Sequence, residues 1–455
     1  MNNAAALTSD RAAVPAPGGA GAASSLTRLA VRASVWTALG YGTSQALRLG
    51  SNLLLTRILF PEAFGLMALV NVFMQGLQMF SDLGIGPSII QNRRGDDPAF
   101  LNTAWTIQVI RGGMLWICAC AIAWPVAAIY GEPMLVQLIP VAGITALIAG
   151  FNSTALFTLN RRLALGKLTL IDLCSQVLSV TVMVVCALLT RSVWALLAAG
   201  LVGSLVKMTL SHVLFRQARN RFRWEDEASR SLIRFGRWIF IASALTFIAY
   251  QGDRLVMGGL FTMTELGVYT VALVISQAGL DLMQQVTGMI LFPLYARVAN
   301  EAYDTLPRKM LRARVALMAA MLPIFCILAV WGKEIVGLLY DPRYQAAGWI
   351  LQLLAAGAIA RAITLTASPA ILACGDSFRH MLLMGSRSAI LIAGMAIGGW
   401  LGGMRGLVIG VAATDVFNYP VLAWATRRYG VWMPGVDAAA AGCAVAFVAA
   451  CVLLF

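Results

Sequence analysis

Apolar stretches of roughly 18 or more residues recur along the whole chain, with short polar connectors between them. A stretch of this length can cross the hydrocarbon core of a bilayer as a helix. Hydrophobic residues make up 60% of the 455 residues and charged residues only 12%, whereas soluble proteins usually carry about 25% charged residues. The sequence therefore predicts an all-α polytopic membrane protein.

The apolar runs divide the chain into thirteen predicted spans. The first six form a predicted N-terminal lobe and the next six a C-terminal lobe, with a disordered cytoplasmic tail before them and an extra helix after them. The predicted domains are 1–30 (tail), 31–216 (N-terminal lobe), 217–232 (basic cytoplasmic linker), 233–430 (C-terminal lobe) and 431–455 (extra transmembrane helix). The predicted spans are 33–58, 63–90, 103–129, 134–158, 168–189, 193–215, 235–256, 265–293, 313–332, 346–372, 380–400, 406–426 and 436–455.

Basic residues gather in alternate connectors. The formal net charge is +14, but no single basic face or tail carries it, which argues against a nucleic-acid partner. Because cytoplasmic connectors are enriched in Lys and Arg, the pattern places the N-terminus in the cytoplasm and the C-terminus in the periplasm. The outer connectors are too short to form an external catalytic domain. We therefore expect no enzyme activity and no catalytic residues.

An internal repeat relates the two lobes. The segment "LFPEAFGLMALVNVFMQGL" from Leu59 matches "LFTMTELGVYTVALVISQAGL" from Leu260, and Gly65 then aligns with Gly267 at a shift of 267 − 65 = 202 residues. Six spans restore the original orientation, so the repeat predicts two lobes related by a pseudo-two-fold axis along the membrane normal. Transporters built in this way bind substrate at the interface of the repeats.

Polar side chains follow one face of the first two helices in each lobe. Helical spacing aligns Gln45, Arg48 and Asn52 on the first helix, and it aligns Gln277 with Asp281 on the eighth. Polar groups in lipid are costly and usually face water or one another. A hydrated central cavity accounts for all these stripes, whereas polar contacts between helices are the simpler alternative.

Several charged residues fall inside the predicted spans. Arg48, Arg361, Asp281 and Asp415 lie deep, and an ion pair of Arg361 with either Asp281 or Asp415 is one interpretation. Arg48 has no basic counterpart in the second repeat, which favours a ligand contact. Asp281 and Asp415 are candidates for binding a coupling proton or Na⁺. Four further charges lie near the inner face, where the cations are expected to snorkel and the carboxylate to be interfacial: Arg111, Asp172, Lys207 and Arg387.

Cofactor and metal signatures are missing from the sequence. Only two His are present, and none of the eight Cys forms a CxxC pair, so no metal site is expected. No Walker A sequence is present, so transport energy is expected from an ion gradient or membrane potential.

The chain resembles the Wzx-like oligosaccharide flippases of the multidrug/oligosaccharidyl-lipid/polysaccharide exporter superfamily. The resemblance covers roughly residues 30–430 and rests on "LLLTRILFPEAFGLMALV", "SDLGIGPSIIQ", "DRLVMGGLFTMTELGVYTVA" and "EIVGLLYDPRYQAAGWILQLLA". It implies a bacterial inner-membrane protein with two six-helix lobes around a central cavity. It also implies a substrate of sugars on an undecaprenyl pyrophosphate carrier, moved from the cytoplasmic to the periplasmic leaflet by alternating access. Such flippases usually have twelve or fourteen spans, which puts the thirteenth span in question.

The candidate substrate-binding residues follow from this resemblance and from their chemistry. Arg48 and Arg361 suit a pyrophosphate, because arginine presents a fixed fork of donors. Sugars need amides, supplied by Gln45, Asn52, Gln75 and Gln277. The expected partners are the lipid-linked oligosaccharide, membrane lipid, and a polysaccharide polymerase with its export machinery. The alternatives are an ion-coupled multidrug or metabolite antiporter of the same fold, and a membrane polysaccharide polymerase or ligase.

Overall fold

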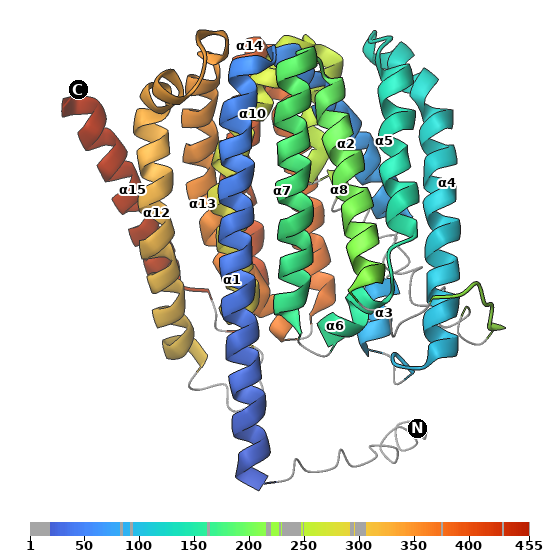
Figure 1. Ribbon diagram of the computed structural model, residues 1–455. Coiled ribbons are helices and arrows are strands. Elements are labelled where there is room, and N and C mark those ends of the chain that lie inside the picture. The colour runs from blue at the N-terminus through green and yellow to red at the C-terminus, as the bar shows by residue number, and fades with distance from the viewer. Residues whose placement is uncertain are drawn as a thin grey trace, which may run out of the picture.

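The computed structural model is a bundle of long, nearly parallel helices (Figure 1). Within the described residues, all regular secondary structure is helical, which confirms the predicted all-α class. The described residues are 19–81, 85–91, 94–161, 164–214, 220–226, 229, 247–248, 250–291, 295, 306–374, 376–429 and 432–454.

The N-terminal half contains α1 (Gly19–Ile58), α2 (Pro61–Phe80), α3 (Ile85–Gln91), α4 (Pro98–Tyr130), α5 (Leu135–Gly150), α6 (Ala155–Arg161), α7 (Leu165–Thr190) and α8 (Trp194–Val213). Helical residues 250–260 precede the labelled helices of the C-terminal half. These are α10 (Met263–Val286) with the π-turn Thr287–Leu291, α12 (Leu306–Leu339), the 3₁₀ turn Pro342–Tyr344, α13 (Ala347–Ala373), α14 (Ser377–Arg427) and α15 (Pro434–Leu454).

Eight described helices are long and apolar enough to cross a membrane, or nine if the bent pair α5–α6 is one span. This identifies a multi-pass membrane protein, although the number is below the thirteen predicted from sequence. Part of the difference lies in α14, which bends at Gly402 and Gly403, where Gly403 has a φ of +54°. A Cβ on Gly394 would lie 3.0 Å from the carbonyl oxygen of Gly410, so the two halves of α14 pack as an antiparallel hairpin.

The remaining difference has other causes. Helix α1 carries the polar stripe and is not among the eight helices that could cross a membrane. Helix α15 contributes only a shorter apolar helix, Pro434–Val448. The first part of the predicted span 235–256 lies outside the described residues. Helix α1 already begins at Gly19, inside the predicted tail 1–30, and residues 1–18 of that tail are also outside the described part.

Two predicted spans are interrupted in the structure. The predicted span 63–90 ends as α2 at Phe80, and a separate short helix, α3, follows. The predicted span 134–158 breaks at Gly150, where the axis turns by 62° into α6. An interrupted helix at membrane depth must have its freed backbone groups satisfied by protein or by a wet cavity.

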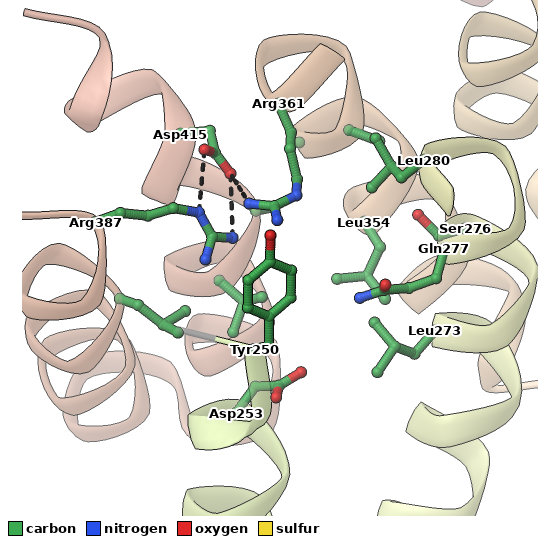
Figure 2. A pocket seen from close by; sticks show the side chains of 15 residues that line it. Tyr250, Asp253, Leu273, Ser276, Gln277, Leu280, Leu354, Arg361, Arg387 and Asp415 are labelled. Atoms are coloured by element: carbon green, nitrogen blue, oxygen red, sulfur yellow. Dashed lines mark hydrogen bonds and ion pairs between the residues drawn. The ribbon is translucent and has the colours of Figure 1, made fainter. Parts of the chain in front are cut away.

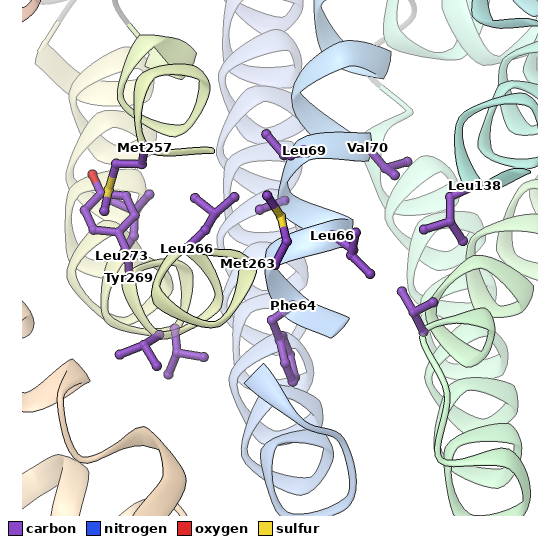
Figure 3. Packing of buried hydrophobic residues seen from close by; sticks show 14 of the residues in the cluster. Phe64, Leu66, Leu69, Val70, Leu138, Met257, Met263, Leu266, Tyr269 and Leu273 are labelled. Atoms are coloured by element: carbon purple, nitrogen blue, oxygen red, sulfur yellow. The ribbon is translucent and has the colours of Figure 1, made fainter. Parts of the chain in front are cut away.

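The repeat glycines lie where the two halves meet. A Cβ on Gly65 of α2 would collide with the carbonyl oxygen of Met263, and a Cβ on Gly267 of α10 would collide with that of Pro61. Buried side chains continue this contact along both helices (Figure 3). The aligned copies of the repeat are therefore in direct backbone contact, while the pseudo-two-fold axis stays a prediction.

Helix α15 is attached to the C-terminal half by a buried ion pair. Arg314 of α12 is fully buried and lies 2.7 Å from Asp437 in the first turn of α15. Tyr419 donates a hydrogen bond to the other carboxylate oxygen of Asp437. Arg314 lies at the start of the predicted span 313–332, and the pairing with Asp437 accounts for its burial.

Candidate functional site

The deep charge of α1 pairs with a carboxylate of α10. Arg48 Nη2 lies 3.0 Å from Asp281 Oδ2, and the two side chains keep 50% and 36% of their surface exposed. The residues are 233 positions apart. Of the two carboxylates predicted as partners for Arg361, Asp281 is therefore engaged by Arg48 instead.

Two of the predicted amides form hydrogen bonds between the two halves. Asn52 Oδ1 accepts a hydrogen bond of 3.1 Å from Tyr340, and Gln75 Oε1 accepts one from Gln251. Both bonds connect the N-terminal half to the C-terminal half. Among the described residues, Gln45 Nε2 is buried without a partner, so it is a donor left for a ligand or water.

A second charged cluster lies inside the C-terminal half (Figure 2). Arg361 of α13 lies 3.4 Å from Asp415 Oδ2, and Arg387 lies 3.2 Å from Asp415 Oδ1. The ring of Tyr250 lies beneath both guanidinium groups, with centroid distances of 5.2 and 5.8 Å. Asp415 is thus paired with both arginines, and its pair with Arg387 spans the α14 hairpin. Of the two partners predicted for Arg361, Asp415 is the one that it contacts in the structure.

Cavities lie on both sides of this cluster. The smaller one, about 70 Å³, is lined by Asp253, Gln277 and Asp415 among others. A cavity of this size with polar lining groups has room for water. The larger one, about 320 Å³, lies toward the π-turn that ends α10 and the start of α14. Tyr250, Arg361 and Arg387 line both cavities and separate them.

The larger cavity is suited to an anion. Among its described lining residues are two arginines and no carboxylate. Thr287 and His380 also line it, and Thr287 Oγ1 and His380 Nδ1 are buried without a hydrogen-bond partner among the described residues. Guanidinium and hydroxyl donors around a cavity of this kind can hold a phosphate group by charge-assisted hydrogen bonds.

Sequence reasoning missed three of these residues. Arg387 was expected to snorkel, yet it is 9% exposed and bound to Asp415. Thr287 and His380 carried no periodic signal. Arg387 and Asp415 lie on neighbouring predicted spans, 380–400 and 406–426. Their opposite charges were the sequence signal that could have predicted this ion pair. Within the described residues, no three His, Cys, Asp or Glu side chains gather as metal ligands would.

Comparison with known proteins gives the fold and the family. The solved structure of the lipid II flippase MurJ, in an inward closed conformation, superposes with a TM-score of 0.74 at 12% identity and covers 92% of each chain. An inward-facing MATE family multidrug resistance transporter of the MOP superfamily superposes with a TM-score of 0.67 at 14% identity, over 87% of this chain and 98% of that one. At such identities the likeness shows the fold alone.

Curated relatives share more of the sequence. The lipopolysaccharide biosynthesis protein WzxC of Escherichia coli (strain K12) is 20% identical over 429 residues, which are 90% of this chain and 85% of that protein. The succinoglycan biosynthesis transport protein ExoT of Rhizobium meliloti (strain 1021) is 23% identical over 289 residues, or 63% of this chain and 58% of that protein. Residues 54–347, well over half of the chain, match the family described as "Polysaccharide biosynthesis protein". With a match of this extent, the chain belongs to the polysaccharide biosynthesis protein family.

Proposed function

We propose that this protein is a flippase that moves oligosaccharides linked to undecaprenyl pyrophosphate from the cytoplasmic to the periplasmic leaflet of a bacterial inner membrane. Membership of the polysaccharide biosynthesis family supports this proposal, as do relatives named for lipopolysaccharide biosynthesis and succinoglycan transport. The protein acts as a transporter rather than an enzyme, and it supplies a polysaccharide polymerase and export machinery on the outer side.

The observation that carries the proposal is the cavity beside Arg361 and Arg387, whose described lining residues include no carboxylate. Its described lining brings two guanidinium groups together with unpartnered Thr287 and His380 atoms. Asp415 contacts both guanidinium groups, and the described lining of the cavity beside them holds no carboxylate. A pyrophosphate bound in this cavity accepts charge-assisted hydrogen bonds from Arg361 and Arg387.

Arg48 has a separate role at the lobe interface in this proposal. Its half-exposed guanidinium contacts the pyrophosphate when Asp281 releases it, while Gln45, Asn52, Gln75 and Gln277 serve the sugars. Asn52 and Gln75 are already bound across the interface to Tyr340 and Gln251. Binding of sugars by these two amides therefore requires the lobes to separate, as alternating access demands.

Ion coupling is assigned to Asp281 in preference to Asp415. A coupling proton or Na⁺ at Asp415 competes with two arginines, whereas Asp281 has Arg48 as its ion-pair partner. Asp281 is also the more exposed carboxylate, at 36% against 6%. Release of Arg48 to the substrate leaves Asp281 available to the ion, which links the two binding events.

The proposal is tested by reconstitution. Purified protein in liposomes should move a fluorescent undecaprenyl-pyrophosphate oligosaccharide between leaflets, read with a membrane-impermeant quencher. Arg361→Gln should abolish movement, and it leaves Asp415 paired with Arg387, so no charge is orphaned. Lys333→Gln, at an exposed position on α12, is the matched control and should behave as wild type. No movement by the wild-type protein would contradict the proposal.

Ion-coupled antiport of a drug or metabolite is the second candidate, favoured by the fold shared with a multidrug transporter. Cationic drugs need acidic cavity groups, and the larger cavity has none among its described lining residues. Uptake of a cationic dye into the same liposomes distinguishes the two candidates. Dye transport without lipid-linked sugar transport would establish the antiporter.

A further inference from the structure

The predicted basic linker between the lobes, 217–232, takes no part in the candidate site. Its described residues are 220–226 and Ser229, and residues 220–226 are called the connector below. The connector runs beside α4, at the end of the bundle where α3 and α6 lie (Figure 1). This is the end at which α1 begins, which is predicted to face the cytoplasm. The connector thus forms a surface of its own, apart from the cavities beside Arg361.

Side chains of α4 fix the backbone of the connector. Asn102 Oδ1 accepts a hydrogen bond of 2.9 Å from the backbone N–H of Arg221. Thr106 Oγ1 accepts one of 3.1 Å from the backbone N–H of Arg223, and the same hydroxyl lies 3.0 Å from the Arg223 carbonyl oxygen. The middle of the connector is therefore bound edge-on to the first turns of α4.

Both ends of the connector are also held by the N-terminal half. Asn220 Oδ1 accepts a hydrogen bond of 2.9 Å from Ser153, and its Nδ2 donates one of 2.7 Å to Thr154 in the turn after α5. Glu225 accepts two hydrogen bonds, of 2.7 and 3.0 Å, from the guanidinium group of Arg94. The shape of the connector is thus set by the N-terminal half, with which it must move.

The outward face of the connector combines aromatic rings with arginines. Phe222 and Trp224 are 68% and 54% exposed, and Arg221 and Arg223 are exposed as well. The Phe222 ring packs on Trp105 with a centroid distance of 4.8 Å, which orients it without covering it. Aromatic side chains beside arginines are typical of the membrane–water interface, where one part of the side chain is apolar and another is wet.

The length of α4 places the connector near that interface. Residues 112–131, from α4 and its C-cap, number twenty and include no charged residue, and about 20 residues cross the hydrocarbon core. Thr106 precedes Gly112 by six residues, about 9 Å along the helix. The headgroup layer adds roughly 5–8 Å on each side of the core. The connector therefore lies at the water side of this layer, which long side chains such as Arg and Trp can reach.

The charges on and beside the connector balance. Trp224 Nε1 donates a hydrogen bond of 3.1 Å to Asp226, so a carboxylate lies beside the exposed ring. Zwitterionic phospholipid headgroups match such a surface, because they offer a phosphate to the arginines and a cationic amine to the carboxylate. The formal charges that sum to zero are those of Arg94, Asp97, Arg221, Arg223, Glu225 and Asp226.

We propose that the connector binds the zwitterionic headgroup layer of the leaflet predicted to be cytoplasmic. The Phe222 and Trp224 rings enter the interface, and Arg221 and Arg223 donate hydrogen bonds to lipid phosphates. Because the connector is also bound to α4, this contact anchors the N-terminal half in the bilayer. The inference goes beyond the proposed function and does not depend on which substrate is transported.

The test is photo-cross-linking of the full chain in phosphatidylcholine vesicles. Phe222→benzoylphenylalanine keeps an aromatic ring against Trp105 and, under ultraviolet light, should form adducts with the lipid, detected by mass on the peptide that contains residue 222. Asp96→benzoylphenylalanine is the matched control at a 46% exposed side chain in the turn before α4. Since Pro98, where α4 begins, lies about 21 Å along the helix from Gly112, the control position is in water and should form no lipid adduct.

The arginine contacts are tested in the same assay. Arg221→Gln combined with Arg223→Gln should lower the yield of lipid adducts at position 222 severalfold, while the amount of inserted protein stays the same. An unchanged yield would overturn the contact with lipid phosphates. Equal yields at positions 222 and 96, or no lipid adduct at position 222, would overturn the whole inference. Cross-linking of position 222 to another protein in whole cells, without a lipid adduct, would show that a protein partner covers this surface instead.

Discussion

Arg48 of α1 lies 3.0 Å from Asp281 of α10 and so connects the first helix of the N-terminal half to the C-terminal half. Both side chains are exposed enough, at 50% and 36%, to be reached by water or ligand. An ion pair of this exposure adds only about 0–1 kcal/mol to stability. The pair is therefore better suited to exchange of partners during transport than to holding the fold together.

Arg48→Ala should reduce transport of the lipid-linked sugar about tenfold to a hundredfold without lowering the amount of inserted protein. The loss follows because a hydrogen bond to a charged group contributes about 1.5–3 kcal/mol. Arg48→Lys keeps the charge but not the two-pronged geometry, so it should keep partial activity. Membrane abundance and exported polysaccharide are measured for each variant. Full export by a normally inserted Arg48→Ala protein would show that the pyrophosphate contact is wrong.

Asp281→Asn should slow transport under an imposed ion gradient and should not affect protein abundance. The amide keeps the shape of the side chain and loses the charge that binds a proton or Na⁺. Transport rates are compared in liposomes with and without a pH or Na⁺ gradient. If the gradient accelerates transport by the Asp281→Asn variant as much as transport by the wild-type protein, Asp281 is only a structural contact between helices.

The sequence predicted local features well because they depend on hydropathy and helical spacing. The all-α class and the alignment of Gly65 with Gly267 rest on such patterns, and the two glycines indeed lie at the contact of α2 with α10. The pairing of Arg48 with Asp281 depends on how two distant helices dock, which no local pattern specifies. The snorkelling expected for Arg387 was wrong for the same reason, since Asp415 reaches it only through the α14 hairpin.

A cavity of about 480 Å³ in the N-terminal half, lined by residues of α4, α5, α7 and α8, shows a further limit of sequence reasoning. Arg111, Asp172 and Lys207 were each explained separately by their distance from the inner face, whereas the structure places all three on one cavity. The break after Gly150 coincides with the turn-forming sequence Gly-Phe-Asn-Ser-Thr at 150–154, which the predicted span 134–158 ran through because its flanks are apolar. At this break, Gln108 of α4 donates to three carbonyl oxygens, two at the end of α5 and one in the turn that follows it, and no local pattern specifies that contact.

Gly267→Ala should weaken the contact between the two halves at the end where α2 and α10 begin. The new methyl group collides with the Pro61 carbonyl, and overpacking of this kind costs about 1–3 kcal/mol. The cost applies only while the halves touch, so the population of separated states should rise. A cysteine at Thr264, whose hydroxyl bonds Glu62 across this contact, should be labelled faster by a maleimide.

Gly337→Ala is the control for this substitution. Nothing lies within 4 Å of a Cβ at this position of α12, so the methyl group meets no neighbour. Labelling of the Thr264 cysteine should match that of the unsubstituted protein. Equal labelling in the Gly267 and Gly337 variants would show that the close approach does not limit opening.

Asp97→Asn should lower thermal stability at neutral pH. The thermal stability of the variant should also fall less steeply than that of the wild-type protein as the pH is lowered. A hydrogen bond from Arg94, followed in strength by one from the Ala99 backbone N–H, lowers the pKa of Asp97 below its ordinary value of 3.8. A lowered folded-state pKa stabilises the protein above 3.8, and this contribution is lost as the pH falls through the lowered value. Asparagine is also a good N-cap, so the change isolates the charge. Identical melting curves against pH would contradict this effect.

The C-terminus should lie in the periplasm, on the opposite side from the start of α1. The first described residues of α1 and the last of α15 lie at opposite ends of the bundle (Figure 1). Arg314 and Asp437 bind the first turn of α15 to the rest of the protein at 2.7 Å, so α15 has a fixed starting point. A reporter that is active only in the periplasm should be active when fused after Phe455 and inactive when fused after Tyr429, in the connector before α15.

Asp437→Asn leaves Arg314 buried without its anion, which typically costs about 3–5 kcal/mol, and should therefore lower the activity of the Phe455 fusion. A cytoplasmic reporter that is active after Phe455 would show that α15 does not cross the membrane.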